Sequence, residues 1–133
     1  FDYGYQNLKD LEADADFTIV DANVLYNGQV AFEDNVVFTA PDGTKIGVFG
    51  LDTPETATKA HPAKIQGVTF VGGQDMMKLA QTEVDTLKAA GCDYVICLGH
   101  LGIDAESTGN RRTNSFCSCP APKVRSVVSA GVK

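Results

Sequence analysis

The sequence lacks the short motifs that mark several large enzyme classes. It has no glycine-rich phosphate-binding loop, no Gly-x-Ser-x-Gly elbow and no Cys-x-x-Cys pair. It also lacks an apolar run near the ~20 residues that a membrane helix needs, and it has no basic-then-apolar signal peptide at its start. We therefore expect a soluble chain without a transmembrane segment, whose natural start need not be Phe1.

Basic residues are scarce. The chain has 11 Lys and Arg against 17 Asp and Glu, for a formal net charge of -6. Binding to a nucleic-acid polymer requires clustered cations, so this balance argues against it, and it is typical of proteins that bind cations or simply stay soluble. With 133 residues and 44% hydrophobic content, the chain can form one domain with a core of ordinary size.

The four cysteines do not form a zinc motif. Cys117-Ser118-Cys119 has one residue between the thiols, and the paired spacing of structural zinc sites is missing. Cys97 lies between Ile96 and Leu98, so we expect it to pack as a small hydrophobic residue. The disulfide state stays open.

Two helices are predicted from apolar periodicity. Residues 5–15 form a short amphipathic pattern, and residues 73–90 form a stronger one. The second helix has an apolar stripe of Met76, Leu79, Ala80, Val84 and Leu87, and a polar side of Lys78, Gln81, Glu83, Asp85 and Lys88. Asp75 can cap its start, and Gly91 suits the left-handed residue that follows many helices.

Several strands are predicted before that helix. The β-favouring runs are residues 17–24, 30–40, 44–51 and 68–71, with a turn at Tyr26-Asn27-Gly28. Pro41-Asp42-Gly43 joins the second and third runs into an antiparallel hairpin. Residues 52–64 contain two prolines and should form a loop.

The most informative stretch is Asp-Tyr-Val-Ile-Cys-Leu-Gly-His-Leu-Gly at residues 93–102. Residues 94–98 read as a strand covered on both faces, entered from the helix as the second half of a βαβ crossover. His100 falls just past the carboxyl end of that strand, where open α/β sheets bind ligands. Imidazole is a common metal ligand, but one histidine is not a metal site, and a structural role remains the alternative.

Other candidate groups are weaker. Asp104 follows His100 by four residues and can orient its imidazole, or it is a solvated loop carboxylate. His61 lies between Ala60 and Pro62 and reads as a surface loop residue. Thr53-Pro54-Glu55-Thr56 resembles a helix or turn opening with Glu55 in reach of backbone amides.

Four segments together carry a family resemblance over residues 1–111. They are Phe-Asp-Tyr-Gly at residues 1–4, Ala-Asn-Val at residues 22–24, Lys-Ile-Gly-Val-Phe-Gly-Leu-Asp-Thr-Pro-Glu-Thr at residues 45–56 and Leu-Gly-His-Leu-Gly at residues 98–102. Their order and spacing resemble the 5'-nucleotidase family of calcineurin-like metallophosphoesterases. In that family Phe-Asp follows a Gly-Asn-His-Glu motif, so we expect the chain to start just after it, in the middle of the metallophosphatase domain.

The resemblance implies a two-metal site that hydrolyses phosphate esters of nucleotides, with Zn, Mn, Mg or Ca as the divalent ions. By position His100 matches a metal-ligating histidine, and Asp2 matches the aspartate that orients the family's catalytic histidine. That histidine, the Asp-x-His loop, the Gly-Asp ligand, the Asn-His pair and the Gly-His-x-His motif are not in this sequence. The implied site is therefore incomplete here.

These observations lead to one set of expectations. The fold class is α/β, a partial metallophosphoesterase sandwich with a mixed sheet, in which residues 1–111 are the central part of the domain and residues 112–133 a divergent tail. The parent function is 5'-nucleotidase or cyclic-nucleotide phosphodiesterase activity in nucleotide breakdown, outside the cell or at its surface. The chain alone should be inactive, bind metal weakly, and self-associate through exposed sheet edges. The alternative is a small non-catalytic α/β module that binds a partner or a metal ion.

Overall fold

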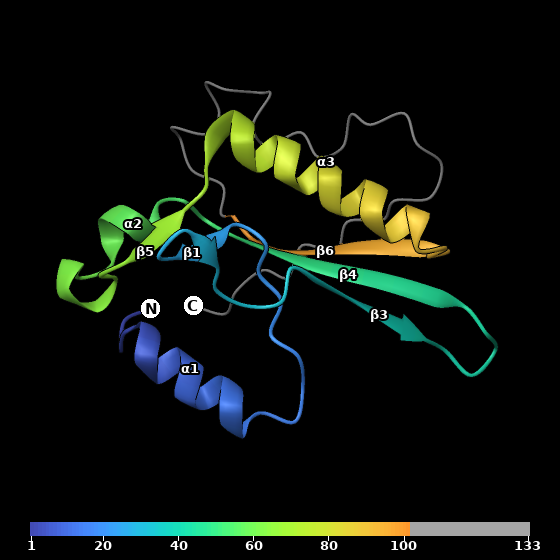
Figure 1. The fold of residues 1–133 in the computed structure, drawn as a ribbon, viewed down its shortest axis with the longest axis horizontal. Helices are drawn as coiled ribbons and strands as arrows, with labels where there is room; N and C mark the ends of the chain where they lie inside the picture. The colour runs from blue at the N-terminus through green and yellow to red at the C-terminus, as the bar shows by residue number, and fades with distance from the viewer. Residues whose placement is uncertain (102–133) are drawn as a thin grey trace.

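The structure, a computed structural model, describes residues 1–101 of the chain. Within this range the chain forms two three-stranded sheets and a long helix that packs on one of them (Figure 1). The sheets combine antiparallel and parallel pairing, which confirms the α/β fold with a mixed sheet. The predictions for Asp104, Cys117, Cys119 and the tail of residues 112–133 lie outside the described residues.

The first sheet is small and entirely antiparallel. Its strands are β1 (Val24–Tyr26), β2 (Gln29–Val30) and β5 (Val68–Phe70), in the order β2-β1-β5. The predicted turn between β1 and β2 is confirmed, because Asn27 has φ 50° and Gly28 has φ 83°, as a two-residue hairpin requires.

The strand predicted for residues 17–24 is wrong for most of its length. Only Val24 lies in a named strand, and Val20 makes one isolated parallel bridge with Glu33. The chain instead attaches to the second sheet through Ala22, whose N–H donates to the carbonyl of Gly50 at 3.0 Å, and through the side chain of Asn23. One backbone bond and the bonds of one side chain thus replace a regular ladder at this point.

The second sheet carries the central part of the fold. Its strands are β3 (Asn35–Thr39), β4 (Lys45–Asp52) and β6 (Tyr94–His100), in the order β3-β4-β6. β3 and β4 form the predicted antiparallel hairpin, and β4 and β6 pair in parallel over seven residue pairs, as the predicted crossover requires. β3 is shorter than the predicted run because Val30 pairs in the other sheet.

Helix α3 (Gly73–Ala89) makes that crossover and covers one face of the second sheet. The shared core contains Phe49, Leu51, Met76, Ala80, Leu87 and Val95. Gly91 has φ 80°, which confirms its left-handed role. Two details differ from the prediction: Asp75 pairs with Lys78 instead of capping the helix, and Glu83 is buried because its Oε2 accepts a 2.6 Å hydrogen bond from Asn35 Nδ2.

The other face of the second sheet is only partly covered among the described residues: Val48 is buried there, but most β6 side chains on this face are exposed. The prediction that both faces of β6 are covered is therefore wrong within residues 1–101. Phe38 is 53% exposed, Tyr94 46% and Leu98 45%. Strand register places Phe38, Ile46 and Tyr94 on one row of this face, because directly paired residues share a side. We refer to the face containing Phe38, Tyr94 and Leu98 as the open face.

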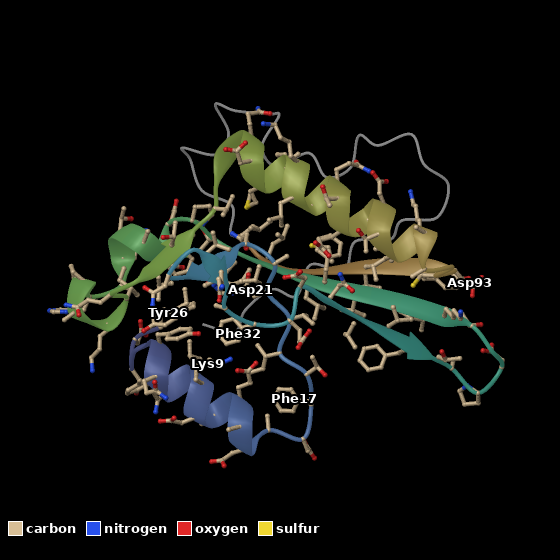
Figure 2. All side chains as sticks on the ribbon, in the orientation of Figure 1. Lys9, Phe17, Asp21, Tyr26, Phe32 and Asp93 are labelled. Atoms are coloured by element: carbon tan, nitrogen blue, oxygen red, sulfur yellow. The ribbon has the colours of Figure 1, made fainter. Side chains whose placement is uncertain are left out.

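Helix α1 (Tyr5–Asp14) confirms the first predicted helix and lies against the first sheet through aromatic rings (Figure 2). Tyr5 stacks on Tyr26 with ring centroids 4.0 Å apart, and Phe1 meets Phe70 edge-on at 5.0 Å. The ammonium of Lys9 lies 5.2 Å from the centroid of the Phe32 ring. The predicted loop of residues 52–64 contains two short helical turns, α2 (Thr56–Lys59) and a 3-10 turn (Pro62–Lys64).

Candidate functional site

The candidate site lies at the carboxyl ends of β4 and β6. His100 is the last residue of β6, which runs two residues beyond the predicted strand end at Leu98. Its Cα partner across the parallel ladder is Asp52, the last residue of β4. Paired residues point to the same side of a sheet, so the imidazole and the carboxylate project from the same face. His100 is exposed, whereas Asp52 is half-buried.

A second carboxylate, Asp21, stands at this edge. Burial raises the pKa of Asp21 from 3.8 to about 7, against the lowering effect of the Asn23 N–H that Asp21 Oδ1 accepts at 3.1 Å, and the charge of Asp52 adds to the increase. Burial also raises the pKa of Asp52, while the Thr53 N–H and His100 oppose that increase. The carboxylate of Asp52 therefore interacts electrostatically with both Asp21 and His100 at the end of β4.

Asn23 holds the end of β4 in place. Its Nδ2 donates to the carbonyl oxygens of Asp52 and Val71, each at 2.9 Å, and its Oδ1 accepts from the N–H of Asp52 at 2.8 Å. The residue is fully buried, with 0% of its surface exposed. Its carboxamide therefore links the second sheet to the residue that follows β5.

Asp2, the predicted catalytic aspartate, lies in the turn before α1 and is exposed. This turn lies near the candidate site, since the amino group of the neighbouring Phe1 is close enough to lower the pKa of Asp52. Within residues 1–101, no hydrogen bond or ion pair joins Asp2 to His100. The structure thus pairs His100 with Asp52, whereas neither a hydrogen bond nor an ion pair joins the two predicted site residues within the described range.

The weaker candidates have structural roles. His61 is exposed, and its Nδ1 accepts a 3.3 Å hydrogen bond from the N–H of Ala63 at the start of the 3-10 turn, in agreement with the predicted loop role. Glu55 does not bind backbone amides through its side chain; it pairs with Lys59 at 3.4 Å. Thr53 Oγ1 accepts the N–H of Glu55 at 3.4 Å instead.

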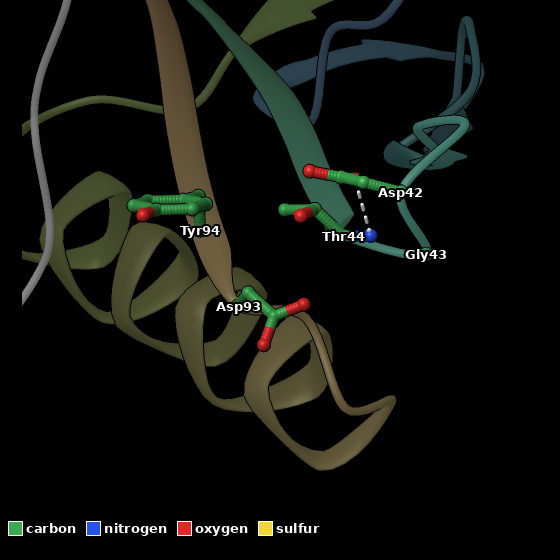
Figure 3. Close-up of a pocket in the computed structure, with 5 residues that line it drawn as sticks. All are labelled: Asp42, Gly43, Thr44, Asp93 and Tyr94. Atoms are coloured by element: carbon green, nitrogen blue, oxygen red, sulfur yellow. Dashed lines mark hydrogen bonds between the residues drawn. The ribbon is translucent and has the colours of Figure 1, made fainter.

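A polar hollow lies at the opposite end of the parallel strands (Figure 3). It is lined by Asp42, Gly43, Thr44, Asp93 and Tyr94. Asp42 Oδ1 accepts the N–H of Thr44 at 2.9 Å, and Asp93 Oδ2 accepts the N–H of Lys45 at 2.9 Å. Both carboxylates thus bind backbone groups at the start of β4, and the hollow is separate from the edge that carries His100.

The part of the chain that the structure describes does not supply a full metal-ligand set. No group of three or more His, Cys, Asp and Glu side chains converges there in a metal-binding arrangement. Asp52 stands beside His100, but the pair lacks the further donors that a catalytic metal centre requires. Residues 1–101 alone therefore do not fit a two-metal centre.

Comparison with known proteins identifies the relatives of this chain. No protein-family model matches the sequence. The 2',3'-cyclic-nucleotide 2'-phosphodiesterase/3'-nucleotidase of Haemophilus influenzae is 31% identical over 139 aligned residues, which cover 96% of this chain and 21% of the relative. The mouse 5'-nucleotidase is 29% identical over 112 residues, covering 80% of this chain and 19% of the relative.

The solved structures agree with these sequences. The calcineurin-like phosphoesterase YfkN from Bacillus subtilis superposes with a TM-score of 0.66 and 28% identity, over 78% of this chain and 33% of that chain. In sequence and fold, the chain is thus similar to the 5'-nucleotidase-type metallophosphoesterases. The sulfate thiohydrolase SoxB from Thermus thermophilus, at 18% identity over 84% of this chain and 20% of that chain, shares the metallophosphoesterase fold with a TM-score of 0.67.

The chain spans about a fifth of the length of the two curated metallophosphoesterase relatives described above. The sequence motifs correctly identified the family, and they included Asn23 and Asp52 without revealing what these two residues do. Their bond joins positions 29 residues apart. A buried asparagine within an otherwise apolar motif was the only available signal, and it did not identify the partner.

Proposed function

We propose that residues 1–101 form the central part of a metallophosphoesterase domain that hydrolyses phosphate esters of nucleotides. The observation that carries this proposal is the position of His100 at the carboxyl end of the β4-β6 pair, in a chain related by sequence and fold to nucleotidases and phosphoesterases. In the whole protein, we infer, a two-metal centre supplies the charge that activates water and neutralises the phosphate.

His100 would hold one divalent ion of that centre through a neutral ring nitrogen, as imidazole does in other metal sites. Its exposed position leaves the ring accessible to a ligand, and the parallel ladder fixes its backbone. We assign Asp2 the role of orienting the catalytic histidine of the family. The chain has two histidines, His61 and His100, so this role requires a histidine from outside the present sequence.

A chimera tests the parent function directly. Residues 1–101 would replace the matching segment of the Bacillus subtilis phosphoesterase, and hydrolysis of AMP and of a chromogenic phosphate diester would be measured with Mn²⁺. We expect activity in the chimera, a loss of at least tenfold in H100A, and little change in H61A, which is the matched control. An inactive but folded chimera, or an active H100A chimera, would contradict the proposal.

We also propose that the 133-residue chain alone is inactive and binds divalent ions weakly. The described residues lack a convergent set of three ligands, which supports this view. Calorimetric titration with Mn²⁺ and Zn²⁺ should show no tight stoichiometric site. A tight site would favour a dedicated metal-binding module instead, and an enzyme-like rate of AMP hydrolysis would refute inactivity.

We propose that the isolated chain self-associates through its second sheet. The open face displays Phe38, Tyr94 and Leu98, and β6 is an edge strand among the described residues. Gel filtration with light scattering should show association that L98K weakens, while F17S, a change at an exposed aromatic outside the sheet, leaves it unchanged. A monomer at all concentrations would contradict this proposal.

For the whole protein we propose a location outside the cell or at its surface, on the strength of the family resemblance. No helix within residues 1–101 is long and apolar enough to cross a membrane. Detection of the native protein in the cytoplasmic fraction alone would refute this location.

A further inference from the structure

Asn23 has properties that ordinary core packing does not require. It is fully buried, and Asn23 and Glu83 are the two buried polar residues that the described range contains. Burying a carboxamide is unfavourable unless its donor and acceptor groups are bonded. Here both are bonded, and the partners are backbone groups of two different strand ends.

The carboxamide of Asn23 substitutes for a missing strand. β3 pairs with β4 only as far as the Asn35–Phe49 pair, so the last part of β4 extends beyond β3. In that space Asn23 Oδ1 accepts the N–H of Asp52, and Asn23 Nδ2 donates to the carbonyl of the same residue. The amide thus offers Asp52 the donor and the acceptor that a neighbouring peptide group would offer in a ladder.

The same amide fixes the distance between the two sheets. The second Nδ2 proton reaches the carbonyl of Val71 at 2.9 Å, and the N–H of Val71 donates to the carbonyl of Asn23 at 2.8 Å. Val71 directly follows β5. The end of β4 is therefore tied to the end of β5 through one side chain.

We propose that Asn23 is a positioning residue for His100. Asp52 is the Cα partner of His100 in the last pair of the β4-β6 ladder. A shift of the end of β4 would therefore also move the backbone of His100. The functional meaning of this role rests on the proposed function of His100. The geometric claim does not, because it concerns the backbone of the chain as it stands.

The chain offers an internal reference for the test. It has two histidines, and His61 lies in an exposed turn to which Asn23 makes no hydrogen bond. The 133-residue chain, labelled with ¹⁵N and ¹³C histidine, would be compared by NMR as wild type, N23D and N23S. N23D keeps the shape of the side chain and loses the two Nδ2 hydrogen-bond donors. N23S removes the carboxamide without adding a charge, and it carries the test if N23D does not fold.

The control variant must lower the stability of the fold without changing the hydrogen bonds of Asn23 to Asp52 and Val71. L87V is suitable, because Leu87 is 1% exposed in the same core and lies near Gly47, toward the other end of β4. We expect the ring and backbone signals of His100 to shift in N23D and N23S by more than the line width, with His61 unchanged. L87V would be compared with the Asn23 variant whose urea midpoint is closest to its own. In L87V the NMR signals of both histidines should stay at their wild-type positions.

Two results would overturn the positioning role: wild-type His100 signals in both Asn23 variants, or an equal His100 shift in L87V, which would show a general loss of stability. This experiment uses neither metal nor substrate. An inactive chimera together with shifted His100 signals would therefore refute the proposed function alone, and an active chimera with unshifted signals would refute the positioning role alone.

Discussion

Replacing Gly50 by alanine should severely weaken the junction between β4 and the segment before β1. A Cβ atom at Gly50 would lie 1.9 Å from the carbonyl oxygen of Val20 and 2.7 Å from its carbonyl carbon. Ordinary contact begins at 3.4 Å, so the Val20 backbone would have to retreat by about 1.5 Å to restore van der Waals separation. Both atoms belong to the backbone, and no rotamer change can relieve the clash.

The loss can be estimated from the bonds that such a movement breaks. The Ala22 N–H to Gly50 carbonyl bond is 3.0 Å long, and a further displacement of this size takes it out of hydrogen-bond range. Its loss costs about 1 kcal/mol or more, and the overpacking itself costs about 1–3 kcal/mol. Replacing glycine in the unfolded chain returns only about 0.4–1 kcal/mol, so the net destabilisation should be roughly 1–4 kcal/mol.

The measurement is urea unfolding monitored by far-UV circular dichroism, and Gly99 in β6 provides the matched control. A Cβ atom at Gly99 would meet Leu101 Cδ1 at 3.6 Å, which is ordinary contact. Gly99→Ala should therefore stay within about 1 kcal/mol of wild type. The reasoning would be refuted if Gly50→Ala were as stable as Gly99→Ala.

Two further predictions concern ionisation. Because folding raises the pKa of Asp21 to about 7, the folded chain binds more protons than the unfolded chain between about pH 4 and 7, and its stability should fall as pH rises through this window, by at most roughly 4 kcal/mol. D21N should flatten this decrease of the urea midpoint with pH, and an unchanged slope in D21N would contradict the assignment. D42N is the control and should keep the wild-type slope, because Asp42 is exposed and its hydrogen bonds to Thr44 lower its pKa. Burial raises the pKa of Cys97 to about 11, so iodoacetamide at pH 8 should alkylate it slowly in the native chain and faster in urea, and equal rates by mass spectrometry would count against its burial.

The elements that the sequence predicted correctly are those set by local patterns. α3 has a continuous apolar stripe, the β3-β4 hairpin has a Pro-Asp-Gly turn, and the β1-β2 turn has Asn-Gly. Each pattern is complete within about twenty residues, so side-chain periodicity and turn chemistry determine it.

The features that the sequence could not predict depend on contacts between distant residues. Glu83 belongs to the polar side of its helix, yet it is buried because Asn35, 48 residues away, bonds to it. The segment of residues 17–23 has β-forming side chains, yet its backbone forms only one isolated bridge, from Val20 to Glu33, and packs closely against Gly50. At the candidate site, the position of His100 at a strand end was predictable, whereas its pairing with Asp52 required the register of a parallel ladder.

The order of the strands along the chain has a consequence for folding. β1 pairs with β5 across more than forty residues, and the whole β3-β4 hairpin lies between them in sequence. The hairpin can close early because its loop is short, whereas the first sheet must wait for synthesis of β5 and for closure of a much longer loop. Asn23 cannot bind Asp52 and Val71 together until that closure has occurred, so the edge that carries His100 should be among the last parts of the domain to reach its native geometry.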